Sequence, residues 1–172
     1  DGLKKKELIG VPWRIAFALQ ASGWYLRSDI IWEKPNAMPE SVKDRPTVSH
    51  EYVFMFAKSE KYQYDKQAMT GPGGRNLRTV WNINTKPCPE AHFATYPEAL
   101  VDPCLALTTK PGDLVLDPFA GAGTTGMAAL RSGRRFLGIE LNPEYAEIAR
   151  KRIEEVAPGS VKTVSLNTDS PE

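Results

Sequence analysis

Two short apolar runs separated by a helical pattern stand out in the second half of the chain. The first run, residues 114–116, is long enough for a buried strand, and the second covers residues 136–139. Between them, a glycine-rich turn leads to a helix that we expect to begin at Thr124 or Thr125 and to end near Gly133. The order strand, turn, helix, strand predicts half of an α/β sheet of the kind that binds nucleotide-like ligands.

Each of these two predicted strands ends on an acid. Asp117 follows the first strand and Glu140 follows the second. Ligands of open α/β sheets bind at the carboxyl ends of the strands. We therefore expect the two carboxylates to face one ligand site.

The first half of the chain opens with a helical pattern that starts at Pro12 and ends at Gly23. Ile15 and Leu19, with the alanines near them, are predicted to form its packed face. A short strand is expected at residues 27–32, centred on two isoleucines.

A second strand is predicted at Tyr52–Ala57, which is apolar on both alternating faces and therefore resembles a central, buried strand. After a turn at residues 58–61, Tyr62 and Tyr64 alternate with polar residues. This pattern predicts that the two segments pair as a β-hairpin.

Residues 66–89 are the least periodic part of the chain and are rich in Gly, Pro, Asn and Thr. A helix led by Pro97 follows, and Pro103 inside it removes one backbone hydrogen bond. Asn142 is expected to cap the last helix, and residues 160–172 form a polar tail that we expect to be loose.

Composition narrows the function only a little. The hydrophobic fraction is 41%, the charged fraction is 25%, and the formal net charge is +1, so any DNA-binding surface must be a local patch. Cys88 and Cys104 lack metal-type spacing, and no metal site is predicted. No apolar run is long enough for a transmembrane helix, and a start at Asp1 rather than Met suggests part of a longer protein.

The glycine turn also fits a second kind of ligand. Gly121, Gly123 and Gly126 match the Gly-x-Gly-x-x-Gly spacing of dinucleotide-binding proteins, and Glu140 follows near the ~20-residue distance of that motif. An oxidoreductase is therefore an alternative. The carboxylate of Asp117 opposes it, because it would repel a pyrophosphate held in the same turn.

A cationic ligand without phosphate turns this carboxylate into an attractive group. S-adenosylmethionine carries a sulfonium and an ammonium, so Asp117 can face its methionine end while Glu140 accepts hydrogen bonds from the ribose hydroxyls. Either acid taken alone is better explained structurally, Asp117 as a turn cap and Glu140 as a solvated strand end. The pair, at this spacing around the turn, favours the cofactor.

Two segments carry a family resemblance. LDPFAGAGTTG, residues 116–126, and FLGIELNPEYAEIARKRI, residues 136–153, resemble motifs I and II of the DNA amino-methyltransferases, which methylate adenine N6 or cytosine N4. Residues 10–36 are similar to motifs V and VI. The resemblance implies one methyltransferase domain over residues 1–172, the C-terminal part of a longer chain.

The fold implied by the resemblance is a three-layer, Rossmann-like α/β domain. Its sheet is expected to be circularly permuted and mostly parallel, with an antiparallel hairpin at one edge and at least one central strand missing. The implied cofactor is S-adenosylmethionine, and HFATYPEAL, residues 92–100, resembles motif X, which helps to hold it. The implied cofactor-binding residues are His92, Phe93, Thr95, Asp117, Phe119, Gly121, Gly123, Thr124, Thr125, Glu140, Leu141 and Asn142.

The resemblance also implies double-stranded DNA as a partner. Residues 66–91 would be a short target-recognition insert, and three tyrosines are candidates to flank a base extruded from the duplex. The tyrosines are Tyr52, Tyr62 and Tyr64. The candidates for phosphate contacts are Lys34, Lys43, Arg45, Arg75 and Arg78.

The catalytic motif of the family is absent from this sequence. It consists of Asp, Asn or Ser followed by Pro-Pro and an aromatic residue, and the chain contains no Pro-Pro pair. The permuted order of the family places the motif upstream of Asp1, so no catalytic residue is expected here and the chain alone is expected to be inactive. Methylation of cytosine N4 is favoured over adenine N6.

Further expectations concern the setting of the protein. The resemblance implies a bacterial or phage-encoded protein of the cytoplasm, with no membrane partner, and leaves a homodimer open. A DNA-binding fragment without catalytic activity is the remaining alternative.

Overall fold

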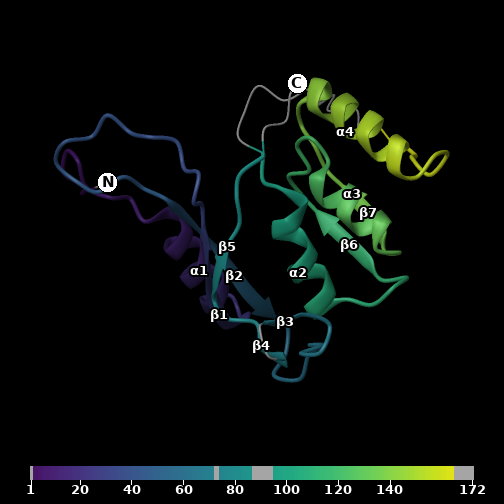
Figure 1. Ribbon diagram of the computed structural model, residues 1–172, viewed down its shortest axis with the longest axis horizontal. Coiled ribbons are helices and arrows are strands. Elements are labelled where there is room, and N and C mark those ends of the chain that lie inside the picture. Colours follow the sequence, from purple (N-terminus) through teal and green to yellow (C-terminus); the bar gives the residue numbers. More distant parts are fainter. Residues whose placement is uncertain (1, 72–73, 87–94, 165–172) are drawn as a thin grey trace, which may run out of the picture. The chain divides into compact units, whose positions relative to one another are not determined.

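The computed structural model describes residues 2–71, 74–86 and 95–164. Two residues predicted to bind cofactor, His92 and Phe93, lie outside the described residues, as does most of the predicted tail. The described elements are helices and strands, which alternate from α2 to α4, and they confirm the α/β class (Figure 1).

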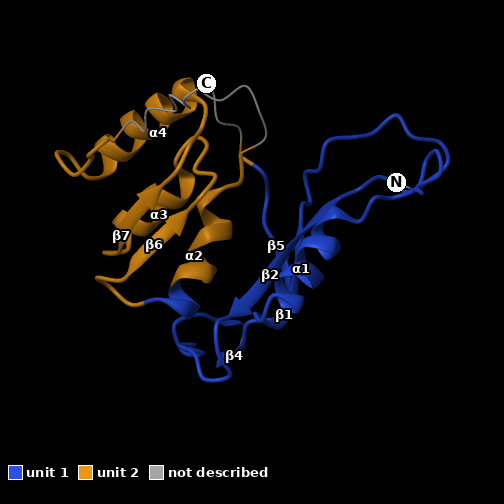
Figure 2. Cartoon of the chain, turned by 180° about the vertical axis from the view of Figure 1, so that it is seen from behind, with its two compact units in different colours: residues 1–85, 106–109 blue, residues 86–105, 110–172 orange. Residues whose placement is uncertain are grey.

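The chain divides into two compact units (Figure 2). Unit 1 comprises Asp1–Thr85 and Ala106–Thr109, and unit 2 comprises Lys86–Leu105 and Lys110–Glu172. The single domain expected over residues 1–172 stays a prediction. We describe each unit by itself.

The sheet of unit 1 contains three strands in the order β2-β1-β5. Strand β1 spans Tyr25–Glu33, strand β2 spans His50–Ala57 and strand β5 spans Val80–Asn82. β1 pairs with β2 in antiparallel register and with β5 in parallel register. The strand predicted at residues 27–32 is confirmed and extends further at both ends.

The predicted hairpin is wrong. Tyr62 and Tyr64 lie in no strand, and β2 pairs with β1, from Tyr25 opposite Ala57 to Glu33 opposite His50. β2 is also at the edge of the described sheet and not at its centre. An alternating pattern identifies a strand but not its partner, and the long ladder with β1 satisfies more backbone groups than a two-tyrosine strand can.

Helix α1 spans Val11–Ala21, with Pro12 in its first turn and Gly23 just beyond its end at a φ of +99°. Both predicted ends are therefore confirmed. The predicted packed face is confirmed for Ala16, which is fully buried, and for Leu19, which is half-buried, but it is wrong for Ile15, which is 55% exposed.

Trp13 sets the packed face of α1. Its ring centroid lies 5.6 Å from that of Tyr52 and 4.9 Å from that of Phe54, both with edge-to-face geometry. Trp13 and Ala16 share one helix face because they are three residues apart. The indole packs against β2, and Ala16 is buried on the same side of the helix.

The stretch predicted to be irregular, residues 66–89, contains short strands. β3, Thr70–Gly71, and β4, Arg75–Asn76, form a small antiparallel ribbon. β5 follows, and its Trp81 is 6% exposed. Two- and three-residue strands are too short to produce a recognisable period, which is why the sequence pattern missed them.

Unit 2 contains the predicted strand–turn–helix–strand arrangement, followed by a further helix (Figure 1). Strand β6 is Leu114–Asp117, helix α3 is Thr124–Arg131 and strand β7 is Arg135–Gly138. Helix α4 is Pro143–Val156, and helix α2, Glu98–Thr108, precedes β6 and contains Pro103. β6 and β7 are parallel, as expected.

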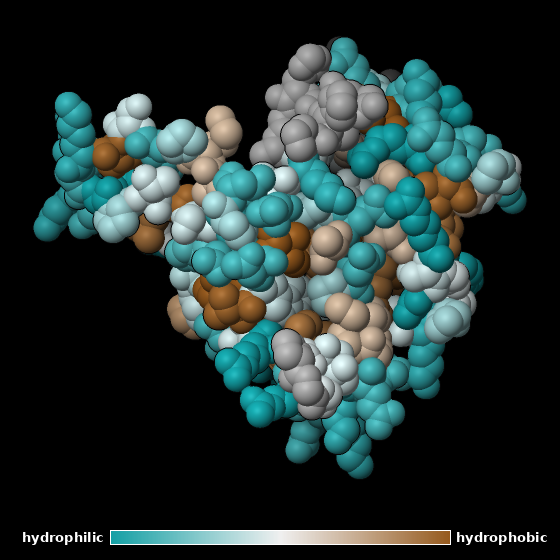
Figure 3. All heavy atoms as spheres, viewed as in Figure 1, coloured by the Kyte–Doolittle hydropathy of each residue, from teal (hydrophilic) through white to brown (hydrophobic). Residues whose placement is uncertain are grey.

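The core of unit 2 lies on one face of these two strands. Val115 and Phe136 pack there against buried residues of two helices, namely Val101 and Leu105 of α2 and Ala128 and Ala129 of α3. The alternate positions of the strands are exposed, with Leu116 at 56% and Leu137 at 50%. Figure 3 shows scattered hydrophobic patches, coloured brown, on a mostly hydrophilic surface.

A single, mostly parallel sheet is not seen in the described residues, where the strands form three separate sheets. The permuted strand order expected from the resemblance stays a prediction. None of the described helices has the length and apolar character needed to cross a membrane.

Candidate functional site

The carboxyl ends of β6 and β7 meet at one edge of unit 2. Asp117 is the last residue of β6 and lies opposite Gly138 of β7, two residues before Glu140. The amide of Ile139 donates to the carbonyl oxygen of Asp117 at 2.9 Å, and the amide of Ala120 donates to that of Ile139 at 2.9 Å. The loop after β6 is therefore attached to the end of β7, which brings the two acids to one place.

Asp117 accepts two hydrogen bonds, one on each carboxylate oxygen. The amide of Phe119 donates to Oδ1 at 3.0 Å, and the hydroxyl of Tyr96 donates to Oδ2 at 3.1 Å. The first bond is the turn cap that the sequence allowed as a structural explanation. Each oxygen retains a second lone pair with which to bind a ligand.

Glu140 holds both sides of the same loop. The amide of Gly121 donates to Oε2 at 2.7 Å and the amide of Asn142 donates to Oε1 at 2.8 Å. The side chain is half-buried, so its orientation is fixed before a ligand arrives. It also retains one lone pair on each oxygen, which suits two neighbouring hydroxyl donors.

The charge of this site is negative. Among the described residues, no lysine or arginine forms an ion pair with Asp117 or Glu140, whose hydrogen-bond partners are neutral amide and hydroxyl groups. One guanidinium contacts the same loop, since Nη1 of Arg152 donates to the carbonyl oxygen of Ala122 at 2.5 Å. The two carboxylates outnumber it, and a net negative charge attracts a cation and repels a phosphate. Across the described ranges, no cluster of three or more His, Cys, Asp and Glu residues offers a metal site.

Two glycines shape the loop between the acids. Gly121 has a φ of +50° and Gly123 a φ of +79°, which L-residues with side chains rarely adopt. A Cβ on Gly123 would lie 2.9 Å from the Cβ of Ala149 in α4. The turn is thus tightly packed on its inner side, and α3 begins directly after it at Thr124.

Two large apolar side chains at the same strand ends face solvent. Phe119 is 86% exposed and Leu141 is 93% exposed, and each lies within two residues of one acid. Apolar surface beside a polar strand end suits a flat, apolar ring. Together with the two carboxylates, these residues fit S-adenosylmethionine, which has a cationic end, a ribose and an adenine.

Other residues predicted to bind the cofactor are buried, half-buried or hydrogen-bonded within the protein. Thr124 is 5% exposed, and the side-chain oxygen of Asn142 accepts from the amide of Glu144 at 2.9 Å, which caps α4. Thr95 is half-buried just before α2. Thr125 hydrogen-bonds to Tyr96 at 2.6 Å.

Tyr96 is the site residue that sequence reasoning missed. The predicted set included its neighbours in the HFATYPEAL segment but not this tyrosine, whose hydroxyl reaches both Asp117 and Thr125. Burial raises the pKa of Tyr96 to about 12, and the nearby Asp117 carboxylate adds to the shift, against the opposing effect of the Thr125 hydrogen bond. A hydroxyl-bearing aromatic next to Pro97 in that segment was the signal available in the sequence.

Two of the basic residues predicted to contact DNA already have acidic partners in unit 1. Lys34 forms an ion pair with Glu51. Arg45 pairs with Glu40 at 2.7 Å, and this hydrogen bond holds the pKa of Glu40 below its ordinary value. Lys43, Arg75 and Arg78 are exposed.

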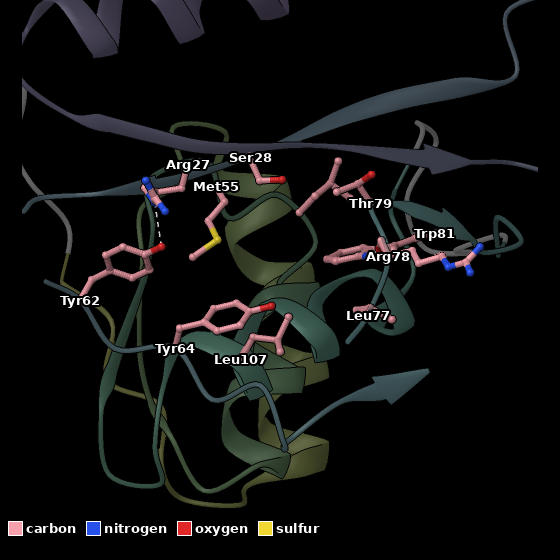
Figure 4. Close-up of a pocket in the computed structure, with 11 residues that line it drawn as sticks. Arg27, Ser28, Met55, Tyr62, Tyr64, Leu77, Arg78, Thr79, Trp81 and Leu107 are labelled. Atoms are coloured by element: carbon pink, nitrogen blue, oxygen red, sulfur yellow. Dashed lines mark hydrogen bonds between the residues drawn. The ribbon is translucent and has the colours of Figure 1, made fainter. Parts of the chain in front are cut away.

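A cavity of about 150 Å³ in unit 1 brings other predicted residues together (Figure 4). Tyr62 and Tyr64 line it, and the Tyr62 hydroxyl accepts from Nε of Arg27 at 2.8 Å. Tyr52 does not line it but stacks on Phe54 instead. Two of the three tyrosines predicted to flank a base therefore share this cavity, and the third does not. The other residues that line the cavity are Arg27, Ser28, Ile30, Met55, Leu77, Arg78, Thr79, Trp81 and Leu107.

Comparison with known sequences gives a consistent result. A sequence profile described as DNA methylase matches residues 3–151. The chain is 62% identical over 158 residues to the Type II methyltransferase M.Cfr9I of Citrobacter freundii, covering 90% of this chain and 53% of that protein. It is 55% identical over 159 residues to M.SmaI of Serratia marcescens, covering 89% and 54%. The chain thus spans about half the length of these curated relatives.

Solved structures match as well. The complex of M1.HpyAVI with SAM has a TM-score of 0.70 and 30% identity, covering 86% of this chain and 71% of that one. The PvuII cytosine-N4-specific DNA methyltransferase has a TM-score of 0.73 and 25% identity, covering 84% and 59%. The chain therefore shares the fold of the matched part of these enzymes.

Proposed function

Because this chain belongs to the DNA methylase family that acts on adenine N6 or cytosine N4, we propose that it forms the cofactor-binding part of a DNA amino-methyltransferase. The reaction would move a methyl group from S-adenosylmethionine to an exocyclic amine of a base in double-stranded DNA. One observation carries the proposal. Asp117 and Glu140 flank one glycine loop at the ends of adjacent parallel strands, with no cationic partner among the described residues.

Each site residue has a distinct task in this proposal. Bound S-adenosylmethionine would supply a methyl group made reactive by its sulfonium charge. Asp117 would attract the cationic methionine end, and Glu140 would accept hydrogen bonds from the ribose hydroxyls. Phe119 and Leu141 would cover the adenine, which buries apolar surface that both side chains now expose.

The target base would be extruded from the duplex before methylation. We favour cytosine N4, and the likeness to the cytosine-N4-specific PvuII enzyme supports this choice. The sequence contains no Pro-Pro pair, so we expect this chain alone to bind cofactor without transferring methyl groups.

DNA contacts belong to unit 1 in this proposal. Lys43, Arg75 and Arg78 are exposed and would contact phosphates directly. Lys34 and Arg45 would first have to exchange their carboxylate partners, Glu51 and Glu40, for a phosphate. Residues 66–91 would help to recognise the target sequence.

We place the protein in the cytoplasm of a bacterium, as part of a restriction-modification system, in line with its bacterial relatives. A homodimer remains an additional proposal, which the molar mass of the protein in solution would test.

Isothermal titration with S-adenosylmethionine tests the cofactor assignment. We expect a dissociation constant on the order of 1 mM or tighter. Asp117→Asn should weaken binding roughly tenfold or more, since hydrogen bonds to charged groups contribute ~1.5–3 kcal/mol. The control is Glu144→Gln, which removes a carboxylate in the first turn of α4 and should leave binding unchanged.

Two outcomes would favour the alternatives. Binding of NAD with no response to S-adenosylmethionine would support a dinucleotide-binding oxidoreductase. A DNA gel shift from a chain that binds neither cofactor would support a DNA-binding fragment without catalytic activity.

A further inference from the structure

The hydrogen bonds of Tyr96 have a defined direction. Its hydroxyl lies 3.1 Å from Oδ2 of Asp117 and 2.6 Å from Oγ1 of Thr125. An ionised carboxylate only accepts hydrogen bonds, so Tyr96 must donate its single proton to Asp117. Thr125 must then donate to Tyr96. The chain of donors runs from Thr125 through Tyr96 to Asp117.

The ring of Tyr96 is held in place from two sides. It packs against the core formed by Val101, Leu105, Ala128 and Ala129. Pro97 follows it and restricts its backbone to extended conformations. Burial raises the pKa of Tyr96 to about 12, so the hydroxyl keeps its proton, and remains a donor, at neutral pH.

Asp117 depends on this donor for its orientation. The second side-chain torsion of aspartate is broad, so a carboxylate held at one oxygen can rotate. The other bond, from the amide of Phe119, comes from the exposed loop. Tyr96 therefore supplies the anchor that comes from the packed core.

We propose that Tyr96 is a positioning residue that fixes the Asp117 carboxylate for the cationic methionine end of S-adenosylmethionine. The inference rests on the proposed function. It goes further by assigning a role to a residue that contacts Asp117 and not the reacting atoms.

The test combines Tyr96→Phe with a ligand that lacks the charged end. Isothermal titration would measure binding of S-adenosylmethionine and of adenosine to the wild-type chain, Tyr96→Phe, Asp117→Asn and the double variant. We expect Tyr96→Phe to weaken S-adenosylmethionine binding about tenfold, since the lost hydrogen bond orients a charged group. Adenosine binding should stay within twofold, because adenosine makes no use of Asp117.

The double variant separates positioning from a general structural effect. Once Asp117→Asn is present, adding Tyr96→Phe should change the affinity less than twofold. Tyr25→Phe removes an exposed hydroxyl from β1 and serves as the matched control, which should bind as the wild type does.

The outcomes distinguish the two proposals. A wild-type chain that binds no S-adenosylmethionine overturns the proposed function and this inference together. Normal wild-type binding that Tyr96→Phe leaves unchanged, or weakens equally for both ligands, overturns only the inference. Additive effects of Tyr96→Phe and Asp117→Asn on the affinity for S-adenosylmethionine would also overturn only the inference.

Discussion

Single residues at the site show how closely its backbone is packed. Gly123 combines a φ of +79° with the absence of space for a side chain, because the Cα of Ala149 lies 3.0 Å from where its Cβ would be. Gly159 has a similar φ of +74° but nothing within 4 Å of that position. An alanine at Gly159 would therefore introduce backbone strain alone, whereas an alanine at Gly123 would introduce backbone strain and steric overlap.

Gly123→Ala should destabilise the chain more than Gly159→Ala. We expect Gly159→Ala to lower the free energy of unfolding by ~1 kcal/mol, the strain of a left-handed residue. Gly123→Ala adds an overlap with helix backbone, and a loss of roughly 2 kcal/mol or more is expected. Urea denaturation followed by circular dichroism measures both, and equal losses would contradict the close packing of α3 on α4.

Tyr96 should make stability depend on pH in the alkaline range. Its pKa is raised from 10.0 to about 12, mainly by burial. The folded chain therefore holds this proton after the unfolded chain has released it, and the contribution present below pH 10 is lost progressively as pH rises towards 12. Between pH 10 and 12, the free energy of unfolding should fall less steeply with pH for Tyr96→Phe than for the wild type. In a titration followed by phenolate absorbance, the variant should lack the ionisation step near pH 12. Identical curves for the two proteins would show that Tyr96 titrates normally.

Some features of the helices and strands could be predicted from neighbouring residues in the sequence, and others could not. Asn142 and Pro143 marked the start of α4 correctly, because a cap needs only residues within one turn. The partner of β2 was predicted wrongly and the packed face of α1 only partly correctly, since both depend on contacts between residues distant in sequence.

The cap of α4 provides the test at this scale. Asn142→Ala should lower the free energy of unfolding by about 1 kcal/mol, because the amide of Glu144 loses its acceptor. Asn142→Ser retains an acceptor and should lower it far less. Urea denaturation of the two variants checks this, and equal losses would mean that the side chain acts elsewhere than in the cap.

Across the whole molecule, the two compact units carry different spectroscopic probes. All four tryptophans, Trp13, Trp24, Trp32 and Trp81, belong to unit 1, whereas Asp117 and Glu140 belong to unit 2. The aromatic cluster around Trp13 belongs to unit 1, and the core formed by Val101, Leu105, Ala128 and Ala129 belongs to unit 2.

S-adenosylmethionine should therefore stabilise the two units unequally. A ligand at 100 times its dissociation constant stabilises the folded state that binds it by ~2.7 kcal/mol. In the described residues most helical circular dichroism comes from α2, α3 and α4, and we expect this transition to shift upward with ligand, while the tryptophan fluorescence transition of unit 1 stays in place. Thermal melts with both probes measure this, and an equal shift in both signals would show that the chain unfolds as one block.

The amino-acid sequence by itself determined the local features of this protein. The strands that end on Asp117 and near Glu140, the glycine turn between them and the cap of α4 follow from residues only a few positions apart, and so do the charge and the shape requirements of the loop. Only the tertiary structure decided that β2 pairs with β1, that Trp13 sets the packed face of α1 and that Tyr96 holds Asp117, 21 residues away. Periodicity and capping act over one or two turns of chain, whereas these contacts depend on which distant segments pack most closely together.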